Sequence, residues 1–275
     1  MTLIRFSNGY AASLTARGRT KGVQGAIYGH SGAEFPEVEV RGLEGTLRDG
    51  GTIFGSRRGM RRITLAVDFR GVTRKQLARD FVPGTPITLS RVTPSGGMLT
   101  GETIDCYLPC VLDSATFASS NLNSTKLSLS FLSEEPFPLG MAELVQGTAT
   151  VDGGLEYPYE YPYKYEGVDT ADRIDFWSRT EVPAEPVITF TASLVAASLT
   201  LTITEAIVID TAIADGDVVV VDSANRTVTI NGVNSLEHIT ESSEWPTVVP
   251  GNNTVSSSSM GLISVTYEPR LVGLL

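Results

Sequence analysis

The stretch GDVVVVDSANRTVTINGVN, residues 216–234, joins a run of valines, a polar turn and an alternating segment. The valines at 218–221 predict a strand buried on both faces, and 227–230 predict the strand that follows the turn. Asn231-Gly232 marks another tight turn, because glycine accepts positive φ at no steric cost. Short strands joined by tight turns predict antiparallel β structure.

The same alternation of apolar and polar residues recurs along the rest of the chain. It appears in ITLAVDFR (63–70), KLSLSF (126–131) and SLTLTIT (198–204). One segment favours a helix, VTRKQLARDFVPG (72–84), where Thr73 can cap the first turn and Leu77, Ala78 and Phe81 share a face. We therefore predict an all-β protein with one short helix, built from β-sandwich or barrel domains.

The strand pattern lapses in the middle of the chain. It stops after LSLSFLSEEPFPLG and resumes near Pro186-Val187-Ile188. At 275 residues the chain is long enough for two domains of ordinary size. We expect one β domain over 1–145 and a second over 146–275, with a linker at 146–182, and we expect both domains to be sandwich-like.

The stretch EYPYEYPYKY, 156–165, holds tyrosines at alternate positions within this expected linker. They could form a stacking platform for a sugar or a base, or belong to a stiff joint between domains. Pro158 and Pro162 favour a three-fold extended helix, in which rings two residues apart point in different directions. We expect a connector that packs against a domain or a neighbouring subunit through Tyr157, Tyr159, Tyr161, Tyr163 and Tyr165.

Charge is divided unevenly along the chain. Residues 1–100 carry 15 Lys/Arg and 7 Asp/Glu, whereas 101–275 carry 6 and 24. Such asymmetry suits either a nucleic-acid face or head-to-tail self-assembly. The arginines at 57–62 are not interleaved with aromatics, so we favour self-assembly and expect no sequence-specific nucleic acid. No signal sequence or long apolar run is present, so we also expect no membrane partner.

The common catalytic and metal-binding patterns are missing from the sequence. His30 and His238 have no metal-ligand spacing, and no nucleophile elbow or phosphate loop occurs. We read Glu134-Glu135 and Glu241 with Glu244 as a solvated acidic surface. We therefore expect no enzyme, catalytic residue, cofactor or metal.

Two other features leave alternatives open. Cys106 and Cys110 on one extended strand would lie too far apart for a disulfide, so we expect reduced thiols. Trp245, followed by proline and framed by alternating valines, is either an anchor at the edge of the core or a platform for a pyranose ring. We favour the anchor.

The stretch 216–234, followed by SSEWPTVVPGNN (242–253), resembles the closing domain of the distal tail proteins of long-tailed phages, the siphoviruses. That family shows a strand ending in a Gly-Asp … Ile-Asp pattern and a short turn into Val-Thr-Ile/Leu-Asn-Gly, then Ser-x-Trp leading to Pro-Gly-x-Asn. The matching motif residues that we expect to be structural are Gly216, Asp217, Asp222, Asn231, Gly232, Trp245, Pro250, Gly251 and Asn252. The first half resembles the ring-forming domain of the family more weakly.

The resemblance implies a structural role in the virion rather than catalysis. It implies a homo-hexameric ring at the tail tip, made by the N-terminal domain, with a C-terminal galectin-like jelly-roll sandwich. The implied partners are further copies of the chain, the tail tube protein and the tail-tip hub, with the tape measure and receptor-binding proteins as additional candidates. The ring would assemble in the host cytoplasm. The alternative is a module that binds host cell-wall glycan.

Overall fold

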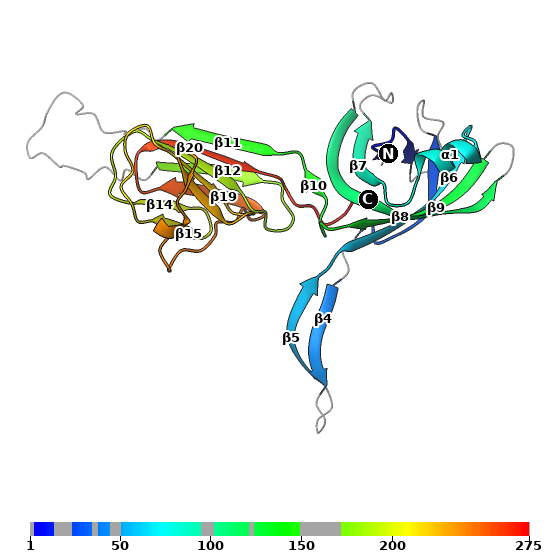
Figure 1. Cartoon of the computed structure of the whole chain (residues 1–275), viewed down its shortest axis with the longest axis horizontal. Coiled ribbons are helices and arrows are strands. Elements are labelled where there is room, and N and C mark those ends of the chain that lie inside the picture. Colours follow the sequence, from blue (N-terminus) through cyan, green and yellow to red (C-terminus); the bar gives the residue numbers. More distant parts are fainter. Residues whose placement is uncertain are drawn as a thin grey trace, which may run out of the picture. The chain divides into compact units, whose positions relative to one another are not determined.

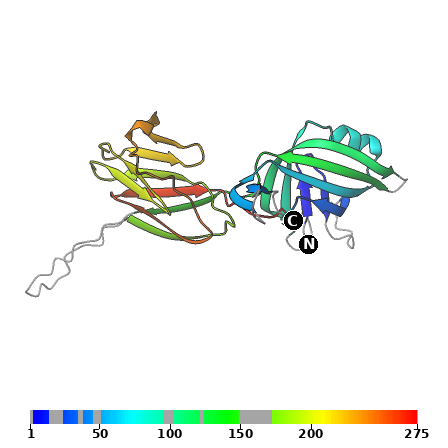
Figure 2. The ribbon, with the colours of Figure 1, turned by 90° about the horizontal axis from the view of Figure 1, so that it is seen from below.

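The computed structural model of the chain describes residues 3–13, 24–34, 38–44, 51–94, 102–120, 124–148 and 172–274. In these ranges the chain is almost entirely β, with one α-helix, which confirms the predicted fold class. It forms two compact units, Met1–Met141 with Arg270–Leu275, and Ala142–Pro269 (Figures 1 and 2). The last residues therefore return to the first unit.

The first unit is a closed barrel. Its sheet runs β10-β8-β7-β1-β2-β3-β6-β9, and a further pairing of β8 with β9 closes it. The strands are β1 (Leu3–Phe6), β2 (Ala11–Ser13), β3 (Gly25–Ser31), β6 (Arg61–Arg70), β7 (Pro86–Pro94), β8 (Glu102–Ser120), β9 (Ser124–Ser133) and β10 (Leu139–Gly140).

Closure depends on the length of β8, which corrects the expectation of a sandwich-like first domain. Residues 102–111 of β8 pair with β7, and 111–120 of the same strand pair with β9. A single 19-residue strand thus bridges the two ends of the sheet. The barrel has no open edge there, because both ends of the sheet find a partner.

The predicted alternation places side chains in the barrel core. On β6, Ile63, Leu65, Val67 and Phe69 are fully buried, whereas the residues between them are only partly covered. The inward residues of β9 belong to the same core. The buried faces of ITLAVDFR and KLSLSF are therefore confirmed.

The predicted helix is α1 (Arg74–Asp80), and it begins at the expected cap. Thr73 accepts the N–H of Gln76 at 3.3 Å, and the Gln76 side chain accepts the N–H of Thr73 at 3.0 Å. Leu77 and Phe81 are buried in the barrel core. Ala78, expected on the same face, is exposed instead, because so short a helix buries only a narrow stripe.

Two strands of the first unit stand apart from the barrel sheet. β4 (Val38–Glu44) pairs antiparallel with β5 (Gly51–Arg58), and no other described strand pairs with either of them. Figure 1 shows them as a separate two-stranded ribbon that leads into β6. Each strand therefore keeps one edge whose backbone groups are unpaired among the described strands.

The C-terminal residues fasten to the first unit through apolar contacts and backbone bonds. Leu271 and Leu274 belong to the barrel core. Leu274 donates its N–H to Ala33 O at 2.9 Å, and Leu271 donates to Pro138 O at 2.9 Å. The chain thus leaves the barrel after Met141 and comes back to it at Arg270.

Arg61, at the start of β6, ties three segments of the first unit together. It is 1% exposed, and its guanidinium donates to Gly32 O at 2.8 Å, Pro136 O at 3.0 Å and Val272 O at 3.3 Å. Burial lowers the pKa of Arg61 below its usual range. Carbonyl oxygens replace the water that this buried cation loses.

The second unit is a sandwich of two antiparallel sheets. One runs β11-β20-β13-β16-β17-β18 and the other β12-β19-β14-β15. The strands are β11 (Glu143–Thr148), β12 (Asp172–Ser178), β13 (Val187–Ala192), β14 (Leu199–Thr202), β15 (Ala206–Ile209), β16 (Val218–Asp222), β17 (Thr227–Ile230), β18 (Val233–Asn234), β19 (Gly251–Ser257) and β20 (Gly261–Tyr267), with a 3₁₀ turn η1 (Leu236–His238).

Inward residues of both sheets form the core of this unit. Ile188 and Phe190 of β13 and Leu199 and Leu201 of β14 are fully buried in it. The valine run on β16 is buried on one face only, since Val219 and Val221 are covered and their neighbours are half-buried. This corrects the prediction of a strand buried on both faces, because the second sheet covers only one side.

The segment expected as a linker, 146–182, contains strand at both of its ends. β11 extends to Thr148 and pairs with β20, while β12 begins at Asp172 and pairs with β19. Both are edge strands, and an edge strand needs apolar residues on one face only. The sequence of β12, DRIDFWS, has apolar residues on its inner face and polar residues between them, so it lacks the apolar run of a central strand. The two strands belong to the sandwich, so both ends of the expected linker lie inside the second unit.

Candidate functional site

The family motif residues at the ends of 216–232 meet at one end of the β16–β17 hairpin. Asn231 Nδ2 donates to Asp217 Oδ1 at 2.8 Å, and Asn231 Oδ1 accepts the N–H of Val218 at 2.9 Å. Asp217 Oδ2 accepts the N–H of Ala214 at 2.7 Å. The motif therefore closes the hairpin by joining the residue before β16 to the residue after β17.

Backbone conformation explains the glycines of this motif. Gly216 has φ +84° and Gly232 has φ +77°, and Asn231 itself has φ +51°. Asparagine tolerates this left-handed region better than most residues, because its short polar side chain bonds locally. The pKa of Asp217 lies below its usual range because the Asn231 amide and the Ala214 N–H both donate to its carboxylate. The charged carboxylate of Asp217 therefore stabilises the turn that leads into β16.

Asp222 shapes the turn at the other end of the hairpin. It accepts the backbone N–H of Asn225 at 3.0 Å and the side-chain amide of the same residue at 2.8 Å. Burial raises the pKa of Asp222, but the donors from Asn225 outweigh burial, so the pKa lies below its usual range. Arg226, which ends this turn, has φ +52°.

The Pro250–Asn252 part of the motif enters β19 through a turn. Gly251 has φ +88°, and Asn252 lies opposite Trp177 on the neighbouring strand β12. The side chain that fixes this turn is Asn253, which the sequence reading missed. It accepts the Val249 N–H at 2.9 Å and donates to Val249 O at 2.8 Å and Gly251 O at 3.0 Å. The family pattern Pro-Gly-x-Asn was the available signal, because its Asn falls on Asn253.

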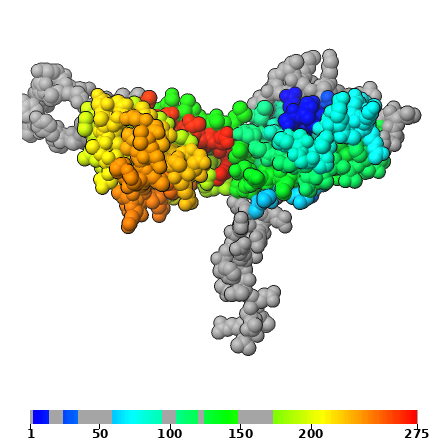
Figure 3. Space-filling view, in the orientation of Figure 1, coloured from blue at the N-terminus to red at the C-terminus, as the bar shows by residue number. Residues whose placement is uncertain are grey.

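Trp245 lies at the edge of the second core and also lines a hollow. Its ring is half-buried and packs against the core cluster, as an anchor does. It also faces a hollow of about 580 Å³. The segment around it, orange in Figure 3, lies at the surface of the second unit. The lining residues are Glu185, Glu205, Ser223, Ala224, Arg226, Ser243, Glu244, Trp245, Pro246 and Thr247.

A second tryptophan, Trp177 on β12, went unnoticed in the sequence. It is 67% exposed and lines a separate hollow of about 440 Å³. Asp175, in the same hollow, accepts hydrogen bonds from Thr254 Oγ1 at 2.6 Å and from Arg173 Nε at 3.0 Å. Both donors lower the pKa of Asp175, with Thr254 the larger cause. The alternation of DRIDFWS was the signal that places Trp177 on the outer face.

The remaining sequence candidates do not gather into a site. Cys106 and Cys110 are thiols, not a disulfide, and both are buried in the barrel core. Across the part of the chain that the structure describes, no three His, Cys, Asp or Glu residues are grouped to hold a metal. Nor does any helix in those ranges have the length and apolar character needed to cross a membrane. The five tyrosines at 157–165 lie outside the described residues.

Comparison with known proteins gives one match for a domain and several for the fold. Residues 179–271 match the family of the siphovirus-type tail component, C-terminal domain. The crystal structure of SPP1 Dit (gp 19.1), a hub of the adsorption apparatus in phages that infect Gram-positive bacteria, is similar over 98% of this chain and 99% of that chain. It has a TM-score of 0.64 at 13% identity. No curated protein sequence matches.

Chains of the phage P2 baseplate in its activated conformation are also similar in part. The similarity to the structure with Ca extends over 99% of both chains, with a TM-score of 0.44 at 11% identity. The structure with Sr has a TM-score of 0.41 at 11% identity. The resemblance to distal tail proteins seen in the sequence is confirmed by the domain match and by the SPP1 Dit fold. Residues 179–271 match the C-terminal domain family of siphovirus-type tail components, and the chain has a fold similar to that of SPP1 Dit.

Proposed function

We propose that the chain is a structural protein of a phage tail tip that forms a homo-hexameric ring. The ring connects the tail tube to the tail-tip hub and the adsorption apparatus. The observation that carries this proposal is the tail-component domain at 179–271, set on a chain whose fold follows that of SPP1 Dit from end to end. Scaffolding, not catalysis, is the activity proposed.

The charge division supports self-assembly through unlike surfaces. The first hundred residues carry a net charge of +8 and the remainder −18. In a ring with cyclic symmetry each copy presents two different faces to its neighbours. Complementary charge on those faces attracts and orients the copies, and it disfavours the wrong arrangement. This supports a cyclic arrangement over a symmetric dimer.

The β4–β5 hairpin supplies a second supporting feature. Each of its strands pairs only with the other among the described strands, so backbone donors and acceptors remain available along two edges. Such edges pair readily with another chain. Within the proposed ring, a neighbouring subunit or the tail tube protein would provide that pairing.

The oligomeric state tests the proposal. Purified protein at micromolar concentration should elute with six times the mass of one chain in light scattering. Negative-stain microscopy should show rings with a central hole. Because charge complementarity is screened by salt, the ring should loosen as ionic strength rises from ~0.05 M to ~1 M, where the Debye length falls to ~3 Å. A protein that stays monomeric even with its tail tube and hub proteins present would overturn the proposal.

The partners and the location follow from the same proposal and need their own experiment. Affinity capture from infected cells should recover the tail tube and hub proteins, with the tape measure and receptor-binding proteins as further candidates. Antibody labelling should mark the tail tip of the mature virion and free rings in the host cytoplasm before assembly. Labelling along the whole tail would contradict the proposed position.

A further inference from the structure

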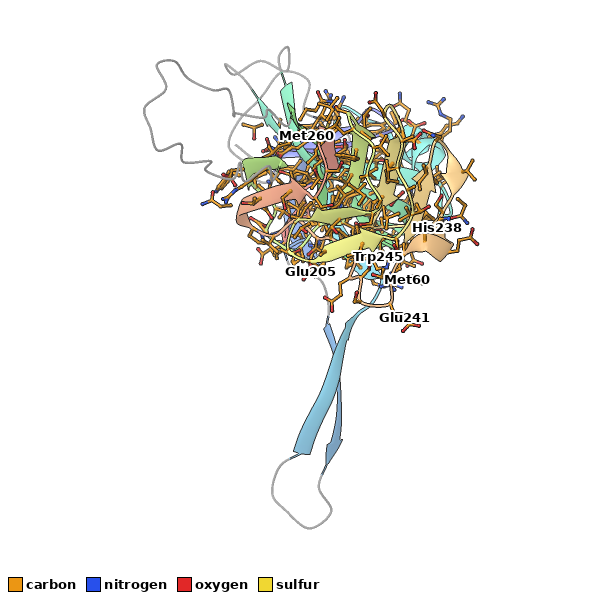
Figure 4. The ribbon with its side chains drawn as sticks, turned by 90° about the vertical axis from the view of Figure 1, so that its left-hand side faces the viewer. Met60, Glu205, His238, Glu241, Trp245 and Met260 are labelled. Atoms are coloured by element: carbon orange, nitrogen blue, oxygen red, sulfur yellow. The ribbon has the colours of Figure 1, made fainter. Side chains whose placement is uncertain are left out.

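The hollow beside Trp245 is built by four segments that lie far apart in the sequence. They are the segment that leads to β13, the turn between β14 and β15, the turn between β16 and β17, and the segment that leads to β19. Trp245 and Glu205, both labelled in Figure 4, come from two of these segments and lie on the same side of the second unit. Only the folded sandwich brings them together.

Hydrogen bonds hold the wall that carries Trp245. Glu244 donates its N–H to Ala206 O at 3.0 Å, and Val248 exchanges backbone bonds with Ala184 at 2.8 and 2.9 Å. The backbone is therefore held by hydrogen bonds on both sides of Trp245, at Glu244 and at Val248. A ring held in this way loses little freedom when a ligand stacks on it, so the site is preorganised.

Glu205 is held by hydrogen bonds in the turn between β14 and β15. Its carboxylate accepts the hydroxyl of Thr204 and, at 3.4 Å, that of Thr247. Thr204 Oγ1 also accepts the N–H of Thr247 at 3.3 Å, which ties the β14–β15 turn to the tryptophan segment. The carboxylate has further lone pairs that can accept hydroxyl groups from a ligand.

Ser223 gives an independent sign that a ligand group belongs here. Its side chain is 4% exposed and lines the hollow, and its Oγ has no hydrogen-bond partner among the described residues. A buried hydroxyl without a partner is costly, and native structures rarely leave one unpaired. Its backbone is held by a 3.1 Å bond from Ser223 N to Pro186 O.

The charges around the hollow are mixed. Glu185, Glu205 and Glu244 provide carboxylates, and Arg226 provides a guanidinium that forms no ion pair within the described ranges. A basic peptide would match the carboxylates but meet repulsion from Arg226. A ligand with many hydroxyls can donate to the carboxylates and accept from Arg226 and Ser223.

We propose that this hollow is a saccharide-binding site, in which one face of a pyranose ring stacks on Trp245. The ring hydroxyls bond to Glu205, Arg226 and Ser223. The volume of about 580 Å³ lies within the range of small-molecule sites and suits one or two sugar rings. The proposal does not rest on ring assembly, so its failure leaves the proposed tail-tip role untouched.

Tryptophan fluorescence provides a direct test. The chain has two tryptophans, so Trp177→Phe leaves Trp245 as the sole emitter. Titration of this variant with N-acetylglucosamine, galactose or glucose should give a saturating change in emission for at least one sugar. Sorbitol, an acyclic polyol without a ring face, is the control and should give none. A linear or absent response to all three sugars, or an equal response to sorbitol, would overturn the proposal.

Substitutions test the assigned residues, with binding measured by calorimetry. Trp245→Ala, Glu205→Gln and Arg226→Asn should each weaken the affinity for that sugar at least tenfold. Asparagine is chosen at 226 because it tolerates positive φ. Trp177→Ala is the matched control and should bind as the wild type does. Because Trp245 also packs against the core, thermal melting checks each variant, and the Glu205 and Arg226 variants decide the outcome if Trp245→Ala unfolds.

Two further outcomes count against the site. If Trp177→Ala abolishes binding and the three hollow variants do not, the sugar binds at the other hollow. If a lysine-rich peptide binds in a Glu205-dependent way and no sugar does, the hollow is a peptide site.

Rings formed by Trp245→Ala, seen in the microscope, would show that loss of sugar binding does not follow from loss of assembly.

Discussion

Asn231 combines a side-chain role with a backbone role at one position. Its amide bridges Asp217 and the N–H of Val218, while its own φ of +51° lies in the left-handed region. Many residues could hydrogen bond here and glycine could adopt the conformation. Asparagine does both, and this is a physical reason for an Asn-Gly pair after β17.

Two substitutions at Asn231 separate these roles. Asn231→Gly removes the bridge and keeps the conformation, so we expect a loss of about 1 kcal/mol of unfolding free energy. Asn231→Ala also removes the bridge but keeps a Cβ at positive φ, so it should be less stable than Asn231→Gly by a further ~1 kcal/mol. Urea denaturation at neutral pH measures both. Equal losses for the two variants would show that the backbone conformation contributes nothing.

Cys110 carries a prediction about reactivity. Burial raises the pKa of its thiol to about 12, against an ordinary value of 9.0. At pH 8 the thiol is therefore almost wholly protonated, and the thiolate is the reactive form. Native protein should react with iodoacetamide at Cys110 far more slowly than protein unfolded in guanidinium, as followed by mass spectrometry. Fast labelling of the native chain would contradict the buried position.

The helix α1 begins where its capping residues in the sequence predict that it should. Thr73 and its partner Gln76 satisfy two of the orphan donors at the start of the helix. The helix is only 7 residues long, so its own propensity cannot hold it. Capping and the burial of Leu77 in the barrel supply the stability instead.

Thr73→Ala should therefore destabilise the first unit by about 1 kcal/mol, the usual cost of losing such a cap. Lys75→Ala, exposed on the same helix, is the matched control and should change stability by less than ~0.5 kcal/mol. Thermal unfolding of both variants gives the comparison. If the two shift the transition equally, the cap does not stabilise the unit.

Elements with a strong local pattern could be predicted, and elements defined by distant partners could not. The faces of β6 and β9 and the cap of α1 follow from neighbouring residues in the sequence. Closure of the barrel depends on β8 pairing with two strands at once, which no local window contains. The hollow at Trp245 was missed for the same reason, since Glu205 and Arg226 approach it from other turns.

At the scale of the molecule, the chain passes between its two units twice. The barrel core and the sandwich core share no residue, yet the barrel core includes Leu271 and Leu274, which follow the last sandwich strand. Each unit therefore has its own hydrophobic driving force for folding. The barrel is completed only when the C-terminal residues have returned to it.

This arrangement predicts that the C-terminal leucines stabilise the first unit and not the second. Leu271→Ala with Leu274→Ala removes two buried side chains, each worth about 2–5 kcal/mol when truncated in a core. Calorimetry should show one unfolding transition moved to a lower temperature or lost, with the other unchanged. Val272→Ala is the control, because Val272 is half-buried and offers Arg61 only its carbonyl oxygen, which the variant keeps.

The assignment of the unchanged transition can be made independently. A fragment of residues 142–269 contains the whole sandwich core, so it should fold alone and melt where the unchanged transition of the double variant does. If the two leucine substitutions moved that transition as well, the sandwich would depend on the barrel for its stability. If they moved neither, burial of Leu274 would contribute far less than its fully covered side chain implies. A selective shift is the outcome expected of two cores joined by a chain that crosses twice.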